Sequence, residues 1–206
     1  MKILALGAHP DDIEIGCAGS LARQVRAGND VYLMIMTTGQ KGGDPDIRTA
    51  EQIESAGILQ ATDVMWGNYD DTRLSADMDK LVSDIEDVLT RIRPDFFFVN
   101  HVDDSHQDHR TLCKAAISAS RNMKNVLFYE VPTTHNFSPS VYVDIHDTMD
   151  TKIDSLLAHR SQIEKTNIEG LSIVDIARST AVYRGIQARV STAEGFMPLR
   201  LFLDFQ

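Results

Sequence analysis

The chain has 206 residues, of which 43% are hydrophobic and 24% are charged, and its formal net charge is −10. A chain of this length and composition fits one globular domain, which buries about 70% of the surface that the unfolded chain exposes. Because the net charge is negative and the 20 Lys and Arg residues do not cluster, we expect no nucleic-acid partner. We predict a single domain over residues 1–206.

The N-terminal residues and the cysteines favour the cytoplasm. A single Lys and a short apolar run precede a polar motif, so the sequence shows no secretory h-region. No apolar stretch has the length of a membrane span. Cys17 and Cys113 lie far apart and lack metal-binding spacing, which suits a reducing compartment better than a disulfide scaffold. We therefore predict a cytoplasmic protein without a membrane span.

Strand-like and helical patterns alternate along the chain. The strand-like runs are 2–8, 30–38, 64–67, 95–100, 126–131 and 141–145. The helical patterns are 13–27, 48–59, 78–92, 108–123, 149–165 and 172–190. This alternation predicts an α/β domain with a mostly parallel sheet and helices on both faces. The last strand-like run alternates apolar and polar residues, which predicts a strand at the sheet edge.

Three polar loops follow the first, second and fourth strand-like runs. Their sequences are H-P-D-D-I-E (9–14), T-T-G-Q-K-G-G-D-P (37–45) and N-H-V-D-D-S-H-Q-D-H (100–109). In open α/β sheets, ligands bind beyond the carboxyl ends of the strands, where the strand order switches. We therefore expect the three loops to enclose one site.

The first and third loops carry a candidate metal site. His9 and Asp12 are three residues apart in a turn stiffened by Pro10, and His109 can add a third ligand. Two imidazoles and one carboxylate leave a coordination position open for water, as in catalytic zinc sites. Zinc lowers the pKa of bound water to about 7. We predict Zn²⁺, with Fe²⁺ and Co²⁺ as alternatives that accept the same ligands.

Neighbouring residues supply candidate catalytic groups. Asp11 is a second carboxylate whose side chain diverges from that of the next residue, so it can take the proton of the water. His106 is placed to face the opposite side of a bound carbonyl, where an imidazolium would stabilise the oxyanion and protonate the leaving group. Asp108 is expected either to orient His106 or to hold a ligand imidazole in one tautomer.

Two other charged residues have more ordinary explanations beside a functional one. Arg48 is either a fork-shaped donor to a substrate hydroxyl or carboxylate, or a salt-bridging helix residue. Glu14 is interpreted as an acid of the first helical turn, where the helix dipole favours a negative charge.

Four motifs resemble successive motifs of the LmbE-like, or PIG-L, zinc deacetylases: A-H-P-D-D-I-E-I-G-C-A-G, T-T-G-Q-K-G-G, R-T-A-E-Q-I-E-S-A and S-H-Q-D-H-R-T. The later stretches K-I-D-S-L-L-A-H-R-S-Q, Y-R-G and A-E-G-F resemble the C-terminal third of that family. The resemblance implies a Rossmann-like domain that hydrolyses an N-acetyl group, commonly from an N-acetylglucosamine unit. It also implies a homo-oligomer, a trimer or a hexamer.

The resemblance assigns a role to each candidate site residue. The matching positions are the zinc ligands His9, Asp12 and His109, the general base Asp11, the oxyanion-stabilising acid His106, its acidic neighbour Asp108 and the substrate-contacting Arg48. Four positions depart from the family pattern, one of which is Gln60, where a Gly often ends the helix. Ile13 and Gln107 replace a common Glu and a common Pro, and Thr72 replaces the Gly that follows the candidate substrate-loop residue Asp71.

We predict a zinc-dependent hydrolase that releases acetate from an N-acetylglucosamine-type conjugate, a small-molecule substrate. The first alternative is a deacylase of another small amide. A non-haem iron oxygenase also uses two His and a carboxylate, but usually with H-x-D spacing on an all-β scaffold. A metal- or nucleotide-binding regulatory module is the non-enzymatic alternative, although the sequence lacks a G-x-G-x-x-G turn after the first strand.

Overall fold

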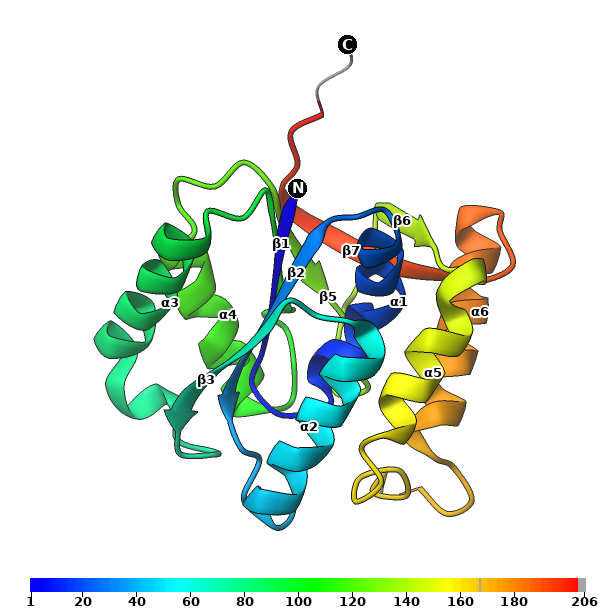
Figure 1. Cartoon of the computed structure of the whole chain (residues 1–206), viewed down its shortest axis with the longest axis horizontal. Helices are drawn as coiled ribbons and strands as arrows, with labels where there is room; N and C mark the ends of the chain where they lie inside the picture. Colours follow the sequence, from blue (N-terminus) through cyan, green and yellow to red (C-terminus); the bar gives the residue numbers. More distant parts are fainter. Residues whose placement is uncertain (167, 204–206) are drawn as a thin grey trace.

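In the computed structural model, which describes residues 1–166 and 168–203, the chain folds around one seven-stranded sheet with helices on both faces (Figure 1). The strands are β1 (Lys2–Gly7), β2 (Asp30–Thr37), β3 (Asp63–Tyr69), β4 (Phe96–Asn100), β5 (Val126–Tyr129), β6 (Val141–Asp144) and β7 (Ala193–Arg200). The α-helices are α1 (Asp12–Arg26), α2 (Pro45–Leu59), α3 (Met78–Ile92), α4 (Gln107–Ala119), α5 (Met149–Leu157) and α6 (Ile173–Ala188).

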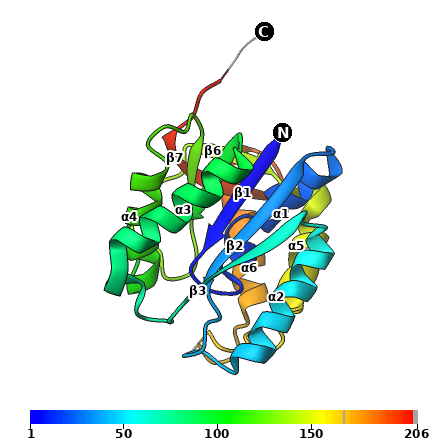
Figure 2. The same ribbon diagram turned by 60° about the vertical axis from the view of Figure 1, so that its left-hand side comes forward.

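The two faces of the sheet bury different sets of side chains because successive residues of a strand point to opposite faces. In β1, Leu4 and Leu6 pack into the core beneath α3 and α4. Ile3 and Ala5 pack into the second core beneath α1 and α2. Figure 2 shows β1, β2 and β3 side by side between these two helical layers. The helix-covered parallel sheet explains why the central strands are apolar along their length.

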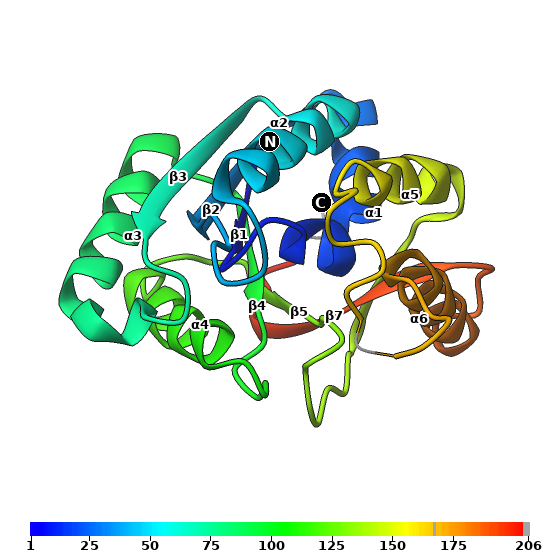
Figure 3. The ribbon, with the colours of Figure 1, turned by 90° about the horizontal axis from the view of Figure 1, so that it is seen from below.

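The strand order places the loops that carry the polar motifs together. The order is β3-β2-β1-β4-β5-β7-β6, and β1 pairs in parallel with both β2 and β4. The order therefore switches between β1 and β4, where α1 and α4 leave toward opposite faces of the sheet. Figure 3 views the molecule from the carboxyl ends of the parallel strands, the edge at which this switch opens. The predicted α/β, Rossmann-like architecture is confirmed, and β6 lies at the sheet edge as expected.

The last strand, β7, was not expected from the sequence. It pairs antiparallel with β5 and with β6, so it is an interior strand of the sheet. Gly195 and Pro198 lie within it, and both residues usually argue against a strand. A Cβ at Gly195 would lie 2.9 Å from the Pro139 ring, so the Gly is required by close packing.

The predicted helix 149–165 ends earlier, at Leu157. The chain then turns inward, and the side chain of His159 is fully buried. The Ser161 amide donates to the Glu51 carboxylate at 2.8 Å instead of to a carbonyl of its own helix. This contact with α2 replaces the hydrogen bond that a longer helix would form. Sequence periodicity within one segment does not predict such a contact with another helix.

A buried ion pair ties α5 and β7 to α1. Lys152 Nζ lies 2.6 Å from Glu194 Oε1, and both side chains are at most 4% exposed. The Glu194 carboxylate also accepts hydrogen bonds from the backbone amides of Gly19 and Ser20 at 3.0 and 2.7 Å. Lys152 donates to the Ile15 carbonyl at 2.6 Å. The pair therefore fixes the helix whose first turn carries the polar motif.

No helix among residues 1–166 and 168–203 is long and apolar enough to cross a membrane.

We predict that Lys152→Met lowers the free energy of unfolding by about 3–5 kcal/mol, because it leaves the Glu194 carboxylate buried without its cation. Urea denaturation of the two proteins measures the difference. Lys80→Met is the matched control, since Lys80 pairs with Asp84 at the surface and such pairs contribute little. Equal shifts of the denaturation midpoint in the two variants would contradict the prediction.

Candidate metal centre and active site

The loops after β1 and β4 bring the three predicted metal ligands together. His9 Nδ1 and His109 Nε2 lie 3.3 Å apart. The Asp12 carboxylate is 3.2 Å from His109 Nε2 through Oδ1 and 3.5 Å from His9 Nδ1 through Oδ2. Donor atoms about 2.0–2.1 Å from a tetrahedral zinc lie about 3.4 Å from one another. The spacing of these three side chains therefore fits a zinc ion.

Local structure fixes the Asp12 carboxylate before any ligand is bound. Asp12 begins α1, and its Oδ2 accepts hydrogen bonds from the amides of Ala8 and His9 at 3.0 and 2.9 Å. Burial raises the pKa of Asp12, but the contacts with His109 and His9 outweigh it, so the pKa lies well below its ordinary value. The carboxylate is therefore ionised and positioned.

The opposite ring nitrogens of both histidines face buried carboxylates. His9 Nε2 lies 3.1 Å from Asp71 Oδ1 and 3.5 Å from Asp108 Oδ2. His109 Nδ1 lies 3.1 Å from Asp104 Oδ2. Metal-binding histidines commonly donate their second N–H to a carboxylate, which fixes the tautomer and orients the ring. Both imidazoles therefore have the environment of metal ligands.

The electrostatics of this cluster also suit a cation. Burial lowers the pKa of His109, but Asp12 and Asp104 raise it to about 9. Burial likewise opposes protonation of His9, yet the carboxylates of Asp108, Asp12 and Asp71 raise its pKa well above the ordinary value. The site thus attracts positive charge strongly enough to overcome desolvation.

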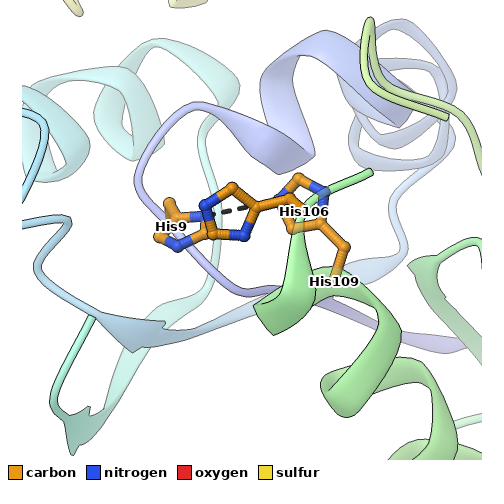
Figure 4. Close-up of side chains that lie close together, drawn as sticks. All are labelled: His9, His106 and His109. Carbon is orange, nitrogen blue, oxygen red and sulfur yellow. Dashed lines mark hydrogen bonds between the residues drawn. The ribbon is translucent and has the colours of Figure 1, made fainter. Parts of the chain in front are cut away.

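His106 lies beside the imidazoles of His9 and His109 (Figure 4). Its ring centroid is 4.6 Å from that of His9 and 4.8 Å from that of His109. His106 caps the N-terminus of α4, where its Nδ1 accepts a hydrogen bond from the Asp108 amide at 3.2 Å. The acceptor role of Nδ1 leaves the ring proton on Nε2. Burial, reinforced by the charges of His9 and His109, lowers the pKa of His106.

The Asp108 carboxylate lies beside the imidazole of His9, a predicted metal ligand. Its Oδ2 accepts a hydrogen bond from the Thr72 amide at 2.6 Å and lies 3.5 Å from His9 Nε2. Only the backbone amide of Asp108 contacts His106. Of the two roles expected for this carboxylate, the geometry thus favours holding the imidazole of His9.

Asp11 lies between the metal-ligand cluster and α2, in a strained backbone conformation. It has φ +93°, a left-handed value that costs energy for a residue with a side chain and that clusters at functional sites. Burial raises the pKa of Asp11 to about 6, and the positive charges of Arg48 and His159 limit the rise. A carboxylate with this pKa is ionised at neutral pH and is basic enough to take a proton.

Arg48 of α2 holds this loop in place. Its Nη1 donates to the Gly39 carbonyl at 2.7 Å, and its Nη2 donates to the Pro10 carbonyl at 2.8 Å. Nη2 also lies 3.3 Å from Asp11 Oδ2. Gly39 has φ +66°, and a Cβ there would lie 1.8 Å from Arg48 Nη1. The guanidinium therefore clamps the loops after β1 and β2 against α2.

A cavity of about 320 Å³ opens over these side chains. Its lining residues are His9, Asp11, Asp12, Lys41, Gly42, Arg48, Asp71, Thr72, His106 and His109. Every predicted site residue except Asp108 therefore lines one cavity, and Asp108 lies behind His9. The arrangement combines metal donors, a carboxylate base and a ring N–H at one opening.

Comparison with known proteins identifies the family. Residues 4–120 match the family model described as "PIG-L: GlcNAc-PI de-N-acetylase". The chain is 35% identical over 167 residues to "Uncharacterized deacetylase YaiS" of Escherichia coli (strain K12), a match that covers 77% of this chain and 90% of that protein. The chain belongs to the PIG-L family.

Solved structures agree with this PIG-L assignment. The conserved protein TT1542 from Thermus thermophilus has a TM-score of 0.88 and 28% identity, covering 98% of this chain and 96% of that one. The N,N'-diacetylchitobiose deacetylase from Pyrococcus horikoshii has a TM-score of 0.83 and 28% identity, covering 96% and 83%. The relatives named here as deacetylases confirm that this PIG-L chain is an enzyme of the hydrolase class.

Sequence reasoning did not predict the positions of several residues at the candidate site. Asp104 belongs to no sequence motif that predicts a role beside His109, although it follows another Asp in the same loop as His106. Asp71 was predicted only as a candidate substrate-loop residue. Glu14 lies in the first turn of α1, as interpreted from the sequence, and its side chain is in addition fully buried. Its Oε1 accepts from Gln52 and Ser55 of α2 at 2.7 and 2.8 Å. Packing of α2 on α1, which no local pattern encodes, buries this carboxylate.

We predict that Asp104→Asn weakens zinc binding by about 10- to 100-fold, because the substitution removes the carboxylate that orients the His109 ring. Competition against a fluorescent zinc chelator measures the dissociation constant. Asp103→Asn is the matched control, since the Asp103 carboxylate accepts a hydrogen bond from the Asn136 side chain and not from His9 or His109. An Asp104→Asn protein with unchanged affinity would show that Asp104 does not orient a ligand.

Proposed function

We propose that the chain is a zinc-dependent N-deacetylase that releases acetate from an N-acetylglucosamine-type amino-sugar conjugate. The observation that carries the proposal is the position of Asp11: its half-buried carboxylate lies at the same cavity as a set of two imidazoles and one carboxylate whose donor atoms are spaced for a metal ion. The family description and the deacetylase from Pyrococcus horikoshii, which is named for a chitobiose substrate, support this substrate class.

The metal would be held by His9 Nδ1, the Asp12 carboxylate and His109 Nε2. Zinc bound to such a set polarises a carbonyl and makes a water molecule acidic at neutral pH. Asp71, Asp104 and Asp108 would keep the two imidazoles in the tautomer that presents a lone pair to the ion. Fe²⁺ and Co²⁺ remain alternatives because they accept the same donors.

Asp11 would act as the general base. Its carboxylate takes a proton from the attacking water and returns that proton to the amine nitrogen when the amide C–N bond breaks. Arg48 and the strained backbone hold this carboxylate at the cavity wall. The carboxylate is thus positioned before the substrate binds.

His106 would stabilise the developing oxyanion through its Nε2–H. Because Nδ1 accepts the Asp108 amide proton, the ring is neutral in this geometry and carries one donor. A neutral donor still stabilises an oxyanion in a water-poor cavity. The hydrogen bond therefore favours Asp11 over His106 as the residue that protonates the leaving amine.

Polar groups on the His106 side of the cavity would bind the sugar. Lys41, Thr72 and Asp71 line this side. The Lys41 amide donates to Asp71 Oδ2 at 2.9 Å, which joins the loops after β2 and β3. Donors and acceptors of this kind match the hydroxyl groups of a hexose. The Arg48 Nη groups already serve two backbone carbonyls, so we assign Arg48 to positioning Asp11 and shaping the pocket.

A regulatory module that binds metal without turnover would not need a carboxylate base in a strained backbone beside the donors. A nucleotide-binding module would place pyrophosphate against Asp11 and Asp12, which repel it. Both features favour a hydrolase over these modules.

We predict that Asp11→Asn lowers kcat about 10²- to 10⁴-fold, because an amide cannot take the proton of the water. Acetate release from N-acetylglucosamine conjugates, with zinc content measured in parallel, tests this expectation. Removal of the metal with a chelator should abolish activity, and zinc should restore it. Asp46→Asn, at an exposed position of α2, is the control. A folded, zinc-loaded protein that releases acetate from no conjugate would contradict the proposal.

A further inference from the structure

A second cavity opens on the opposite side of the same catalytic residues. It has a volume of about 340 Å³ and shares Asp11, Asp12 and His109 with the polar cavity. Its apolar wall, which we call the isoleucine groove, consists of Ile15, Val131, Pro132, Ile168, Ile173 and Ile176. These residues come from α1, the loop after β5, the segment before α6 and the start of α6, which meet at the edge seen in Figure 3.

The isoleucine groove is accessible although it is apolar. Ile168 is 57% exposed, and Ile15 and Ile176 are only partly buried, whereas Ile173 and Val131 close the floor. A large apolar side chain exposed beside a strongly acidic site has no role in the core. Contiguous exposed apolar surface of this kind typically marks a binding site.

The two cavities separate at a defined contact. Lys165 lines the second cavity and Gly42 lines the polar cavity, and the Lys165 ammonium donates to the Gly42 carbonyl. The three shared residues thus lie where the two cavities meet. A substrate whose reacting carbon lies beside Asp11 would extend one substituent into each cavity.

The linings of the two cavities indicate which half of an amide enters which cavity. The polar cavity carries Lys41 and Thr72, which suit a sugar, whereas the isoleucine groove suits an acyl chain. The amine half therefore fits the polar cavity, and the acyl half points into the isoleucine groove. The methyl group of an acetamide would leave most of this groove empty.

We propose that the isoleucine groove binds the acyl group, so that the enzyme accepts N-acyl amino sugars with an acyl chain longer than acetyl beside the N-acetyl conjugate and hydrolyses them with a higher kcat/KM. The inference rests on the proposed amide hydrolysis at Asp11. Water oxygen bonds to the carbonyl carbon, the C–N bond breaks, and Asp11 carries a water proton to the amine nitrogen. The products are the carboxylate of the acyl group and a free amino sugar, with no change of oxidation state.

The test compares kcat/KM of the zinc-loaded enzyme for N-acetyl-, N-butanoyl-, N-hexanoyl- and N-octanoyl-glucosamine. Each methylene buried in the groove should raise kcat/KM by up to about fourfold, the factor that corresponds to about 0.8 kcal/mol. We expect a rise from acetyl to hexanoyl. Turnover of the acetyl substrate with a decrease along the series would overturn this inference alone. Absence of turnover for every substrate, acetyl included, would overturn the proposed function and the inference with it.

A matched pair of variants separates the groove from general effects on helix α6. Ile176→Asn should lower the ratio of hexanoyl to acetyl kcat/KM about tenfold, because a polar amide replaces part of the apolar wall. Ile186→Asn makes the same change on the same helix at a position that is 62% exposed and outside both cavities. This control should leave the ratio unchanged. Equal ratios in the two variants would overturn the inference.

The groove has one other candidate occupant, an apolar aglycone. The octyl glycoside of N-acetylglucosamine supplies that arrangement with the acetyl group retained. We expect its kcat/KM to stay within about threefold of the methyl glycoside. A larger gain for the octyl glycoside, lost in Ile176→Asn, would assign the groove to the aglycone and overturn the acyl assignment.

Discussion

Four buried aspartates surround two imidazoles at the switch point of the sheet, and the organisation of this edge depends on how their charge is balanced. Asp12, Asp71, Asp104 and Asp108 are each at most 4% exposed. Burying ionised carboxylates is costly unless positive charge and hydrogen bonds compensate. The donor atoms of His9 and His109, 3.3 Å apart with Asp12 against both, leave space for one small dication. The strand order that sets β1 beside β4 brings these groups together.

Contacts from other parts of the fold hold the loops and the helix that carry this cluster in place. The buried Lys152–Glu194 pair fixes α1 from one side, and Arg48 clamps the loops after β1 and β2 from the other. Asp11 lies between these two restraints, in a backbone conformation that an isolated turn would avoid. The catalytic edge then opens into two cavities of opposite character, which gives the site a polar half and an apolar half.

The sequence predicts what is local and misses what arises from packing. Alternating strands and helices, with polar loops at strand ends, indicate the fold and bring His9, Asp12 and His109 to one edge. The carboxylates behind the imidazoles are less visible, since Asp71 reaches His9 from 62 residues away. The burial of Glu14 was not predicted, because the packing of α2 over its face of α1 has no local pattern. β7 was missed because Gly195 and Pro198 are unusual in an interior strand.

Anomalous X-ray scattering at the zinc absorption edge, from crystals of the zinc-loaded protein, tests the central claim most directly. The account predicts one anomalous peak, bonded to His9 Nδ1, the Asp12 carboxylate and His109 Nε2. The neighbouring donor set of His9, Asp71 and Asp108 also lies close enough to hold an ion. A peak bonded to that set, or zinc-loaded crystals without a peak at the cluster, would contradict the account.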